Sequence, residues 1–250
     1  MGVLRFDQLL PGPGEVQMDE LLAGLALPDK APPDRPYVIA NFVTSVDGRA
    51  TFQGGSGQLG DEGDLDVFRA LRREVDAVLA GTGTLRAERY GRMLKLPESR
   101  ERRRRRGLAP EPLATTLTRG GDVPLDIPLF AEPEAEVVVF SGSEIDVSGA
   151  AAHVEVVVLD PPHLGAALRH LRAHHRVRVL LCEGGPSLLA ALVRERLVDE
   201  LFLTLAPQLT GGGTGPTLTT GPELPELRGM ELAGVLERAG SLFLRYRLGN

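Results

Sequence analysis

A glycine-rich loop carries the sharpest chemical signal in the sequence. It reads Glu183-Gly184-Gly185-Pro186-Ser187-Leu188 and lies between a strongly apolar run and a run with helical spacing. Two glycines let the backbone approach a ligand closely, and a helix that begins near Ser187 offers unpaired N–H groups and a positive dipole end. The loop therefore predicts a pyrophosphate site, with Glu183 directed into the crevice. The alternative is a plain turn in which Pro186 and Ser187 start a helix.

A second glycine loop, Gly81-Thr82-Gly83-Thr84, resembles a dinucleotide fingerprint but has Arg86 at the third glycine position. It either directs backbone and hydroxyl donors at a cofactor or forms a tight strand-to-helix turn. Arg86 and Arg89 follow it. An arginine near an adenosine ribose favours a 2′-phosphate, and hence NADPH over NADH. The alternative is that both arginines are surface charges.

Two further loops follow expected strands. Residues 44–60 contain Asp47 before Gly48, a pair that can shape a turn, and then a glycine-rich stretch. This loop is too long for a plain connection, and such loops often cover active sites. The other loop, Thr118-Arg119, says little by itself.

Parallel strands would bring these loops together. Short apolar runs at 37–45, 75–80, 113–118, 137–141, 154–159, 177–182 and 200–206 predict strands, and helical spacing at 64–74, 84–90, 164–174 and 187–196 predicts helices. Fully apolar strands that alternate with helices indicate an α/β fold, with a mostly parallel central sheet and helices on both faces. Residues 230–236 and 241–248 predict an antiparallel C-terminal edge. Such sheets bind ligands beyond the carboxyl ends of their strands.

The first 35 residues differ from the rest. They are rich in proline and glycine and contain a short helix candidate at 18–27 and a linker at 28–36. We expect an N-terminal arm over 1–35 that packs onto something else or stays mobile. Residues 36–250 then form one domain.

Composition excludes several classes of protein. The chain lacks the roughly 18 consecutive apolar residues of a membrane helix and the pattern of a signal peptide, which favours the cytoplasm. The lone Cys182 excludes an internal disulfide and a multi-cysteine zinc site, and its apolar surroundings predict a buried hydrophobe. The five histidines show no metal-binding spacing. His170 and His174 are one turn apart on an expected solvated helix, so no metal site is predicted.

A cationic run interrupts an otherwise acidic chain of net charge −6. Residues 100–106 hold six arginines, and such a run can contact nucleic acid. No aromatic residues are interleaved to stack on bases. We therefore favour a solvated helix or loop insertion, and a nucleic-acid partner is not expected.

The ordered set of motifs resembles one family. Asn41–Gly48, Ser56-Gly57, Leu71-Arg72, Gly81–Thr84, Glu183–Leu189, Leu197–Leu201 and Ala206-Pro207 are similar to the pyrimidine reductase domain of riboflavin biosynthesis, from about Arg35 to the C-terminus. The resemblance implies a dihydrofolate-reductase-like fold, usually dimeric. It implies that NADPH reduces the ribosyl group of 5-amino-6-(5-phosphoribosylamino)uracil to the ribityl form, with hydride delivered to the sugar C1.

The resemblance also implies roles for residues. Glu183 would contact the pyrimidine, and Asp47 would lie near the reacting groups, so these two are the titratable candidates for catalysis. The expected substrate-binding residues are Asn41, Ser56, Gly57, Arg72 and Glu183. The expected cofactor-binding residues are Val43, Leu59, Gly81, Gly83, Thr84, Glu88, Thr118, Gly184, Gly185, Pro186, Ser187 and Leu188.

The sequence departs from the family pattern at two places. Family members often have lysine where this chain has Asn41, and often an aromatic residue near Gln58-Leu59. Asn41 supplies no positive charge and exchanges no proton, so much of the rate would come from holding C1 against the nicotinamide. The bifunctional enzymes also carry a zinc deaminase with a His-x-Glu and Pro-Cys-x-x-Cys signature. Here His153-Val154-Glu155 has no such partner, and we expect any deaminase activity to come from another protein.

Three alternatives remain open at this point. The first is a reductase on the same scaffold with another substrate, such as dihydrofolate. The second is a nucleic-acid-binding or regulatory protein that uses Arg100–Arg106 and has a vestigial cofactor pocket. The third is a cofactor-binding protein without turnover.

Overall fold

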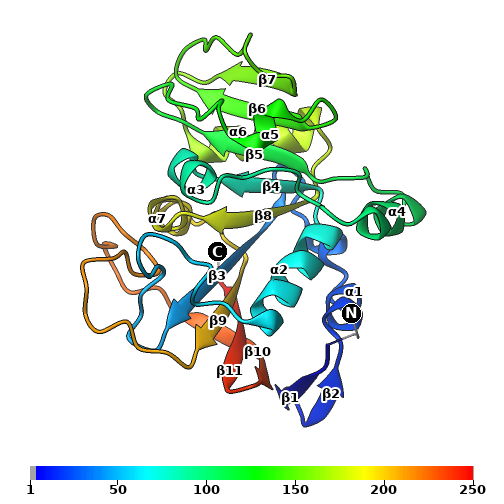
Figure 1. Cartoon of the computed structure of the whole chain (residues 1–250), viewed down its shortest axis with the longest axis vertical. Helices are drawn as coiled ribbons and strands as arrows, with labels where there is room; N and C mark the ends of the chain where they lie inside the picture. Colours follow the sequence, from blue (N-terminus) through cyan, green and yellow to red (C-terminus); the bar gives the residue numbers. More distant parts are fainter. Residues whose placement is uncertain (1–3, 250) are drawn as a thin grey trace.

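A single sheet of eleven strands runs through residues 4–249, the part of the chain that the computed structural model describes (Figure 1). Its strands are β1 (Phe6–Leu10), β2 (Gly14–Val16), β3 (Tyr37–Ser45), β4 (Ala77–Ala80), β5 (Leu113–Leu117), β6 (Glu136–Ser141), β7 (His153–Val158), β8 (Val179–Gly184), β9 (Glu200–Ala206), β10 (Met230–Arg238) and β11 (Ser241–Leu248). The order across the sheet is β2-β1-β10-β11-β9-β3-β8-β4-β5-β6-β7. The strands from β9 to β7 are parallel, and those from β2 to β9 pair antiparallel. The predicted α/β fold with an antiparallel C-terminal edge is confirmed.

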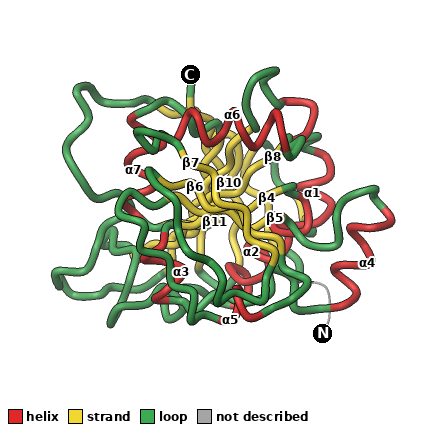
Figure 2. Tube along the Cα trace, turned by 90° about the horizontal axis from the view of Figure 1, so that it is seen from above, coloured by secondary structure: helices red, strands yellow, loops and turns green. Residues whose placement is uncertain are grey.

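Helices cover both faces of the sheet, as the apolar strands require. One face packs against α1 (Met18–Gly24), the 3-10 turn η1 (Leu27–Lys30), α2 (Glu62–Glu74), α3 (Thr82–Ala87) and α5 (Pro128–Ala131). The other face packs against α6 (Leu164–His174) and α7 (Pro186–Arg194). Figure 2 shows α6 on one side of the strands and α2 and α5 on the other. Successive residues of a strand point to opposite faces, so adjacent pairs such as Leu180 and Leu181 are both fully buried.

The N-terminal residues join the sheet rather than forming a separate arm. β1 pairs with β10 and β2 pairs with β1, both antiparallel. Phe6 is buried and meets the ring of Phe243 edge-on at 5.1 Å between centroids, and Met18 and Leu22 of α1 are buried. Of the two alternatives expected for this segment, packing is the one that the structure shows, against the chain's own sheet.

The arginine run forms α4 (Pro97–Arg105), and its cations have partners within the chain. Arg103 is 1% exposed, so the expectation of a fully solvated segment is wrong at this residue. The other pairs are Arg100 with the Leu94 carbonyl, Arg102 with Asp19, Arg104 and Arg105 with Glu101, and Arg106 with Glu74. This internal pairing weighs against a nucleic-acid surface, because a phosphate would have to displace carboxylates.

Two expected exclusions can be compared with the structure. Cys182 is fully buried, and burial raises the pKa of its thiol to about 12. It therefore behaves as the small hydrophobe that its sequence context indicates. Within residues 4–249, no helix combines the length and apolar character needed to cross a membrane.

Candidate active site

The loops after β3, β4 and β8 border a cleft of about 560 Å³. These strands are neighbours, β3 parallel to β8 and β8 parallel to β4, so their carboxyl ends lie at one edge of the sheet. This edge is where parallel α/β sheets bind ligands. The sequence-predicted residues that line the cleft are Asn41, Val43, Ser56, Arg72, Gly83, Thr84, Glu88, Glu183, Gly184, Gly185 and Pro186.

Other predicted residues lie outside the lining of this cleft. They are Asp47, Gly57, Leu59, Gly81, Thr118, Ser187 and Leu188. Leu59 is 2% exposed and belongs to the packed interior, and the buried Thr118 donates its N–H to the Phe140 carbonyl. Ser187 and Leu188 are the second and third residues of α7, behind Pro186.

Asp47 has a structural position that explains its absence from the cleft. Its carboxylate accepts hydrogen bonds from Ser45 Oγ at 2.5 Å, from Thr210 Oγ1 at 2.9 Å and from the Gly211 N–H at 3.1 Å. These hydrogen bonds, led by that of Ser45, lower the pKa of Asp47. An ionised carboxylate of this kind holds the segment after β9 in place and is a poor proton donor.

Glu183 forms a buried ion pair at the centre of the cleft. Its side chain is 2% exposed. Arg72 Nε and Nη2 donate to its two oxygens, each at 2.6 Å, and the Tyr90 hydroxyl donates at 2.8 Å. Burial alone would lower the pKa of Arg72, but the charge and hydrogen bonds of Glu183 raise it overall. Burial, followed by the charge of Glu183, raises the pKa of Tyr90 well above its usual value. The carboxylate is therefore a fixed acceptor held by a cation and a neutral phenol.

The last turn of α2 aims Arg72, and aromatic rings hold its guanidinium. The guanidinium carbon lies 4.1 Å from the centre of the Phe68 ring and 5.3 Å from that of Tyr90. Such cation–π contacts add to the ion pair in a desolvated site. Phe68 precedes Arg72 by one helical turn, so the same face of α2 supplies both side chains.

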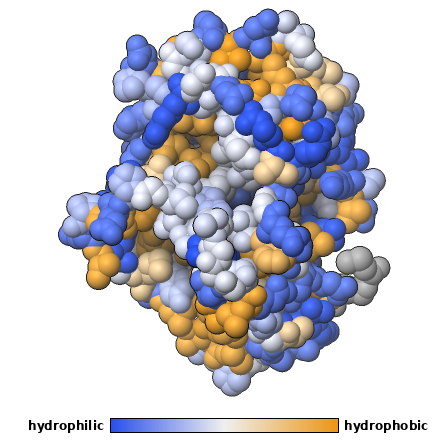
Figure 3. Space-filling model, turned by 60° about the vertical axis from the view of Figure 1, so that its left-hand side comes forward, coloured by the Kyte–Doolittle hydropathy of each residue, from blue (hydrophilic) through white to orange (hydrophobic). Residues whose placement is uncertain are grey.

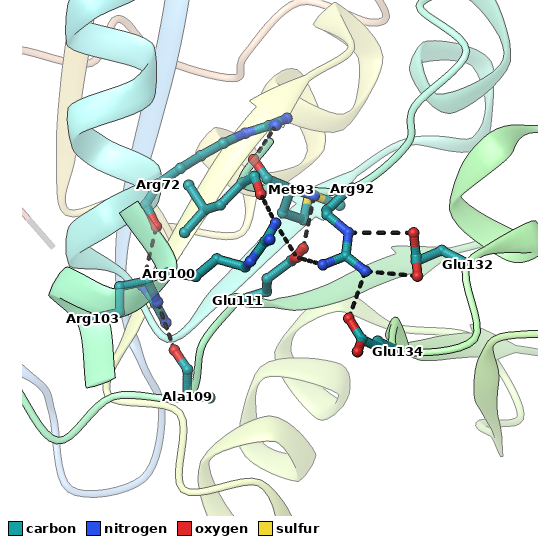
Figure 4. Close-up of polar contacts among 10 residues, drawn as sticks. Arg72, Arg92, Met93, Arg100, Arg103, Ala109, Glu111, Glu132 and Glu134 are labelled. Carbon is teal, nitrogen blue, oxygen red and sulfur yellow. Dashed lines mark hydrogen bonds and ion pairs between the residues drawn. The ribbon is translucent and has the colours of Figure 1, made fainter. Parts of the chain in front are cut away.

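A network of arginines fixes the wall of the cleft between Tyr90 and Ser99 (Figure 4). Arg72 Nη1 donates to the Met93 carbonyl at 2.9 Å, and Glu111 accepts from the Met93 N–H at 3.0 Å. Arg92 contacts Glu111, Glu132 and Glu134 at 3.2, 2.6 and 2.7 Å. These contacts join the wall both to α2 and to the segment after α5.

The two glycine loops touch each other beside Thr84. The Gly81 N–H donates to the Gly184 carbonyl at 2.7 Å, so Gly81 links the two loops without lining the cleft. A Cβ on Gly185 would stand 3.0 Å from Thr84 Oγ1, and Gly184 has φ +114°. The missing side chains let the two loops pack closely against each other, beside the N-terminus of α7, whose positive dipole end suits phosphate oxygens. The residues present therefore fit a dinucleotide cofactor.

Comparison with known proteins shows the family. The model of the RibD C-terminal domain matches residues 36–241. The chain belongs to the RibD C-terminal domain family. The 2,5-diamino-6-ribosylamino-4(3H)-pyrimidinone 5′-phosphate reductase of Archaeoglobus fulgidus is 32% identical over 194 residues, which cover 75% of this chain and 87% of that protein. The riboflavin biosynthesis protein RibD of Aquifex aeolicus is 26% identical over 72% of this chain and 49% of its own.

A solved structure confirms the fold of this RibD-family reductase. A pyrimidine reductase-like protein from Corynebacterium diphtheriae superposes with a TM-score of 0.75 at 24% identity, over 94% of this chain and 100% of its own. The resemblance that the motifs indicated is therefore confirmed at the level of family and fold. With relatives named as reductases, the chain is an oxidoreductase.

Asn41 of the reductase lines the cleft and has an unsatisfied buried acceptor. The residue is 8% exposed, and its Oδ1 has no hydrogen-bond partner within residues 4–249. Buried polar atoms are nearly always paired. The position that departs from the family pattern therefore offers an acceptor to a ligand rather than a charge.

Two cations that sequence reasoning missed also line the cleft. Arg69 lies on α2 and Lys95 on the wall after Met93. In the described part of the chain no ion pair joins either of them to a carboxylate. Tyr90, Met93 and Lys95 have no spacing or motif in the sequence that marks them, because tertiary contacts alone bring this segment to the cleft.

Proposed function

We propose that this reductase uses NADPH to reduce the ribosyl group of a 6-ribosylaminopyrimidine 5′-phosphate to the ribityl form. The observation that carries the proposal is the buried Glu183 carboxylate between the touching glycine loops and the wall with Lys95. The candidate substrates are 5-amino-6-(5-phosphoribosylamino)uracil and the 2,5-diamino-pyrimidinone for which the Archaeoglobus relative is named. We place the activity in the cytoplasm.

Each part of this substrate has a counterpart in the cleft. One N–H group of the pyrimidine would donate to Glu183, whose two oxygens offer about four acceptor sites, three of which Arg72 and Tyr90 already use. A sugar hydroxyl would donate to Asn41 Oδ1, which lacks a partner in residues 4–249. The 5′-phosphate would lie near Arg69 and Lys95, the cations outside the ion pairs. The ion pair with Glu183 leaves Arg72 as an orienting group for the carboxylate.

The cofactor would occupy the side of the cleft that the glycine loops form. NADPH, when bound, supplies the hydride that reaches C1 of the sugar. Gly184, Gly185 and the start of α7 would hold its phosphates, with Val43 and Thr84 beside it. Arg86 and Arg89 face Asp122 and Asp126 at 2.9 and 3.7 Å, and all four side chains are exposed. Exposed pairs of this kind are weak, so either arginine is available to a 2′-phosphate.

The described acids of the cleft are poor proton donors, and Lys95 is assigned to the phosphate. Asn41 exchanges no proton, Glu183 is held in an ion pair, and the carboxylate of Glu88 accepts from Ser56 Oγ at 3.0 Å. We infer that the residues of the cleft act by orientation, holding C1 against the nicotinamide, and that solvent supplies the proton.

The function is tested by following NADPH oxidation with each pyrimidine ribotide and with dihydrofolate offered separately. We expect turnover of at least one ribotide and none of dihydrofolate. Turnover of dihydrofolate alone would replace the proposed substrate by the first alternative. NADPH binding without turnover of any compound would leave a cofactor-binding protein.

Lys95→Ala is expected to raise KM for the ribotide by about tenfold, the effect of losing one hydrogen bond to a charged group of about 1.4 kcal/mol. The dephosphorylated nucleoside should be used equally well by the variant and the parent. Arg105→Ala, which removes an exposed charge on α4, is the control. If KM rises equally for the ribotide and the nucleoside, Lys95 does not bind the phosphate.

Ser187→Asp is expected to raise the Kd of NADPH by about tenfold, because a new negative charge near a pyrophosphate costs on the order of 1 kcal/mol. An acid in the first turn of a helix is not destabilising, so the Tm should not fall. Ser187→Asn has the same size without the charge and serves as the control. Equal Kd values for the two variants, measured by fluorescence titration, would remove α7 from the cofactor site.

We also propose that the reductase is a homodimer through its antiparallel edge. Leu203 and Leu205 of β9 pair with Leu244 and Leu242 of β11, and Val235 of β10 continues the row. All five side chains are only half-buried, and Figure 3 shows apolar side chains gathered over the lower part of the molecule. A second copy would cover this row.

We expect light scattering to give twice the mass of the chain for the parent protein and the mass of one chain for Leu244→Glu. A monomeric parent protein would contradict the proposal.

A further inference from the structure

Three potential metal ligands meet at the end of the sheet opposite the antiparallel edge. Glu155 lies on β7, the last strand, His170 lies on α6, and His175 follows α6 directly. His170 Nε2 is 3.5 Å and His175 Nε2 is 3.2 Å from the Glu155 carboxylate. The three ligand atoms all lie within 4.8 Å of one another. The sequence analysis predicted no metal site, because Glu155 on β7 and His175 at the end of α6 share no motif or regular spacing.

The two imidazole nitrogens are buried without hydrogen-bond partners in the described residues. His170 Nε2 and His175 Nε2 are both closed to solvent, although the side chains are 20% and 22% exposed. A separation of 3.5 Å is longer than an ordinary N–H···O bond, so the carboxylate does not saturate His170. Imidazole Nε2 atoms are common metal ligands.

The distances from Glu155 to the two imidazole nitrogens suit a small tetrahedral ion. Ligands about 2.0–2.1 Å from a tetrahedral Zn²⁺ lie about 3.3 Å from one another, close to the two separations seen here. Two imidazoles and one carboxylate favour zinc-class ions over Mg²⁺ or Ca²⁺, which prefer oxygen ligands. His174 stacks on His170 with ring centres 4.3 Å apart, and Phe140 meets the same ring edge-on at 5.7 Å. The two rings hold the imidazole in its orientation.

We propose that Glu155, His170 and His175 bind a divalent transition-metal ion of the zinc class, with its fourth position open to water. The site is structural, because β7 lies four strands beyond β8, at about 4.8 Å for each step. Figure 1 shows β7 at the far end of the sheet from β3 and β8. The ion would pin the end of α6 to the edge strand. Edge strands expose unpaired backbone groups and need such protection.

The test uses the untagged, chelator-treated full chain and Co²⁺ or Zn²⁺ as the probe. We expect one Co²⁺ per chain with the visible absorption of a tetrahedral site. Zn²⁺ at roughly a hundredfold excess over its Kd should raise the Tm by about 5 °C or more. Turnover of NADPH should be the same with and without the ion, because the cleft is distant.

Glu155→Gln and His175→Gln should each weaken Co²⁺ binding by at least about tenfold, since even the loss of an outer partner of a ligand costs that much. Both residues are at the surface or partly exposed, so these variants should fold. His153→Ala, an exposed histidine on the same strand, is the matched control and should bind as the parent does. Absence of Co²⁺ uptake by the parent, or uptake that both glutamine variants retain, would overturn the proposal.

Discussion

Glu183→Gln is expected to lower kcat/KM for the pyrimidine ribotide by about 10- to 100-fold, while the Kd of NADPH changes by less than about threefold. Loss of a hydrogen bond between charged groups costs about 1.5–3 kcal/mol. The substitution removes the charge opposite Arg72 and the acceptor that we assign to the substrate. The amide also presents an NH₂ group where Arg72 and Tyr90 already donate. Donors then face donors, and the carboxylate site for the ring is lost.

Stability and binding must be separated in this experiment. Breaking a buried ion pair is destabilising by about 3–5 kcal/mol, so kinetics are measured well below the Tm of the variant. Tyr90→Phe removes one hydrogen bond to Glu183 and no charge, and should lower kcat/KM by about tenfold or less. Equal losses in NADPH binding and in ribotide turnover would place Glu183 in the cofactor site or in the fold alone.

The sequence predicts best the elements that carry their own local signal. The strands Tyr37–Ser45 and Glu200–Ala206 are runs of apolar, β-branched and aromatic residues, and the structure has them with the expected bounds. The helix Leu164–His174 is equally well defined by its spacing. β1 and β2 escape prediction because they are short and flank Pro11, and pairing with the distant β10 is what makes β1 a strand.

Only part of the cleft could likewise be predicted from the sequence. Its glycine loops could be found because strand ends, glycines and helix starts are all local patterns. The wall with Tyr90 and Lys95 could not, since its position depends on contacts between residues far apart in the sequence. Arg72 holds Met93 from 21 residues away, and Arg92 holds Glu132 from 40 residues away. No period or motif encodes such pairs, and the same holds for the approach of His175 to Glu155.

Arg103→Met is expected to lower the free energy of unfolding by at least about 3 kcal/mol and the Tm by roughly 6 °C or more. Arg103 is the largest of the fully buried side chains in the described residues. Its guanidinium donates to the carbonyls of Arg72, Arg73, Val75 and Ala109 at 3.1, 3.1, 2.6 and 2.8 Å. The first two belong to the last turn of α2, where carbonyls have no partner within the helix.

Methionine retains most of the aliphatic packing of Arg103 and removes every hydrogen-bond donor. The loss of stability therefore measures the cost of leaving the four carbonyls without a partner. Burial lowers the pKa of Arg103 to about 10, and the side chain therefore stays charged at neutral pH. Arg104→Met, at an exposed position of the same helix, should change the free energy of unfolding by less than about 0.5 kcal/mol. Arg103 also holds the backbone of Arg72, so kcat for the ribotide should fall in Arg103→Met even at temperatures where the variant is folded. A stable variant with unchanged kcat would show that water replaces the guanidinium and that α2 needs no such cap.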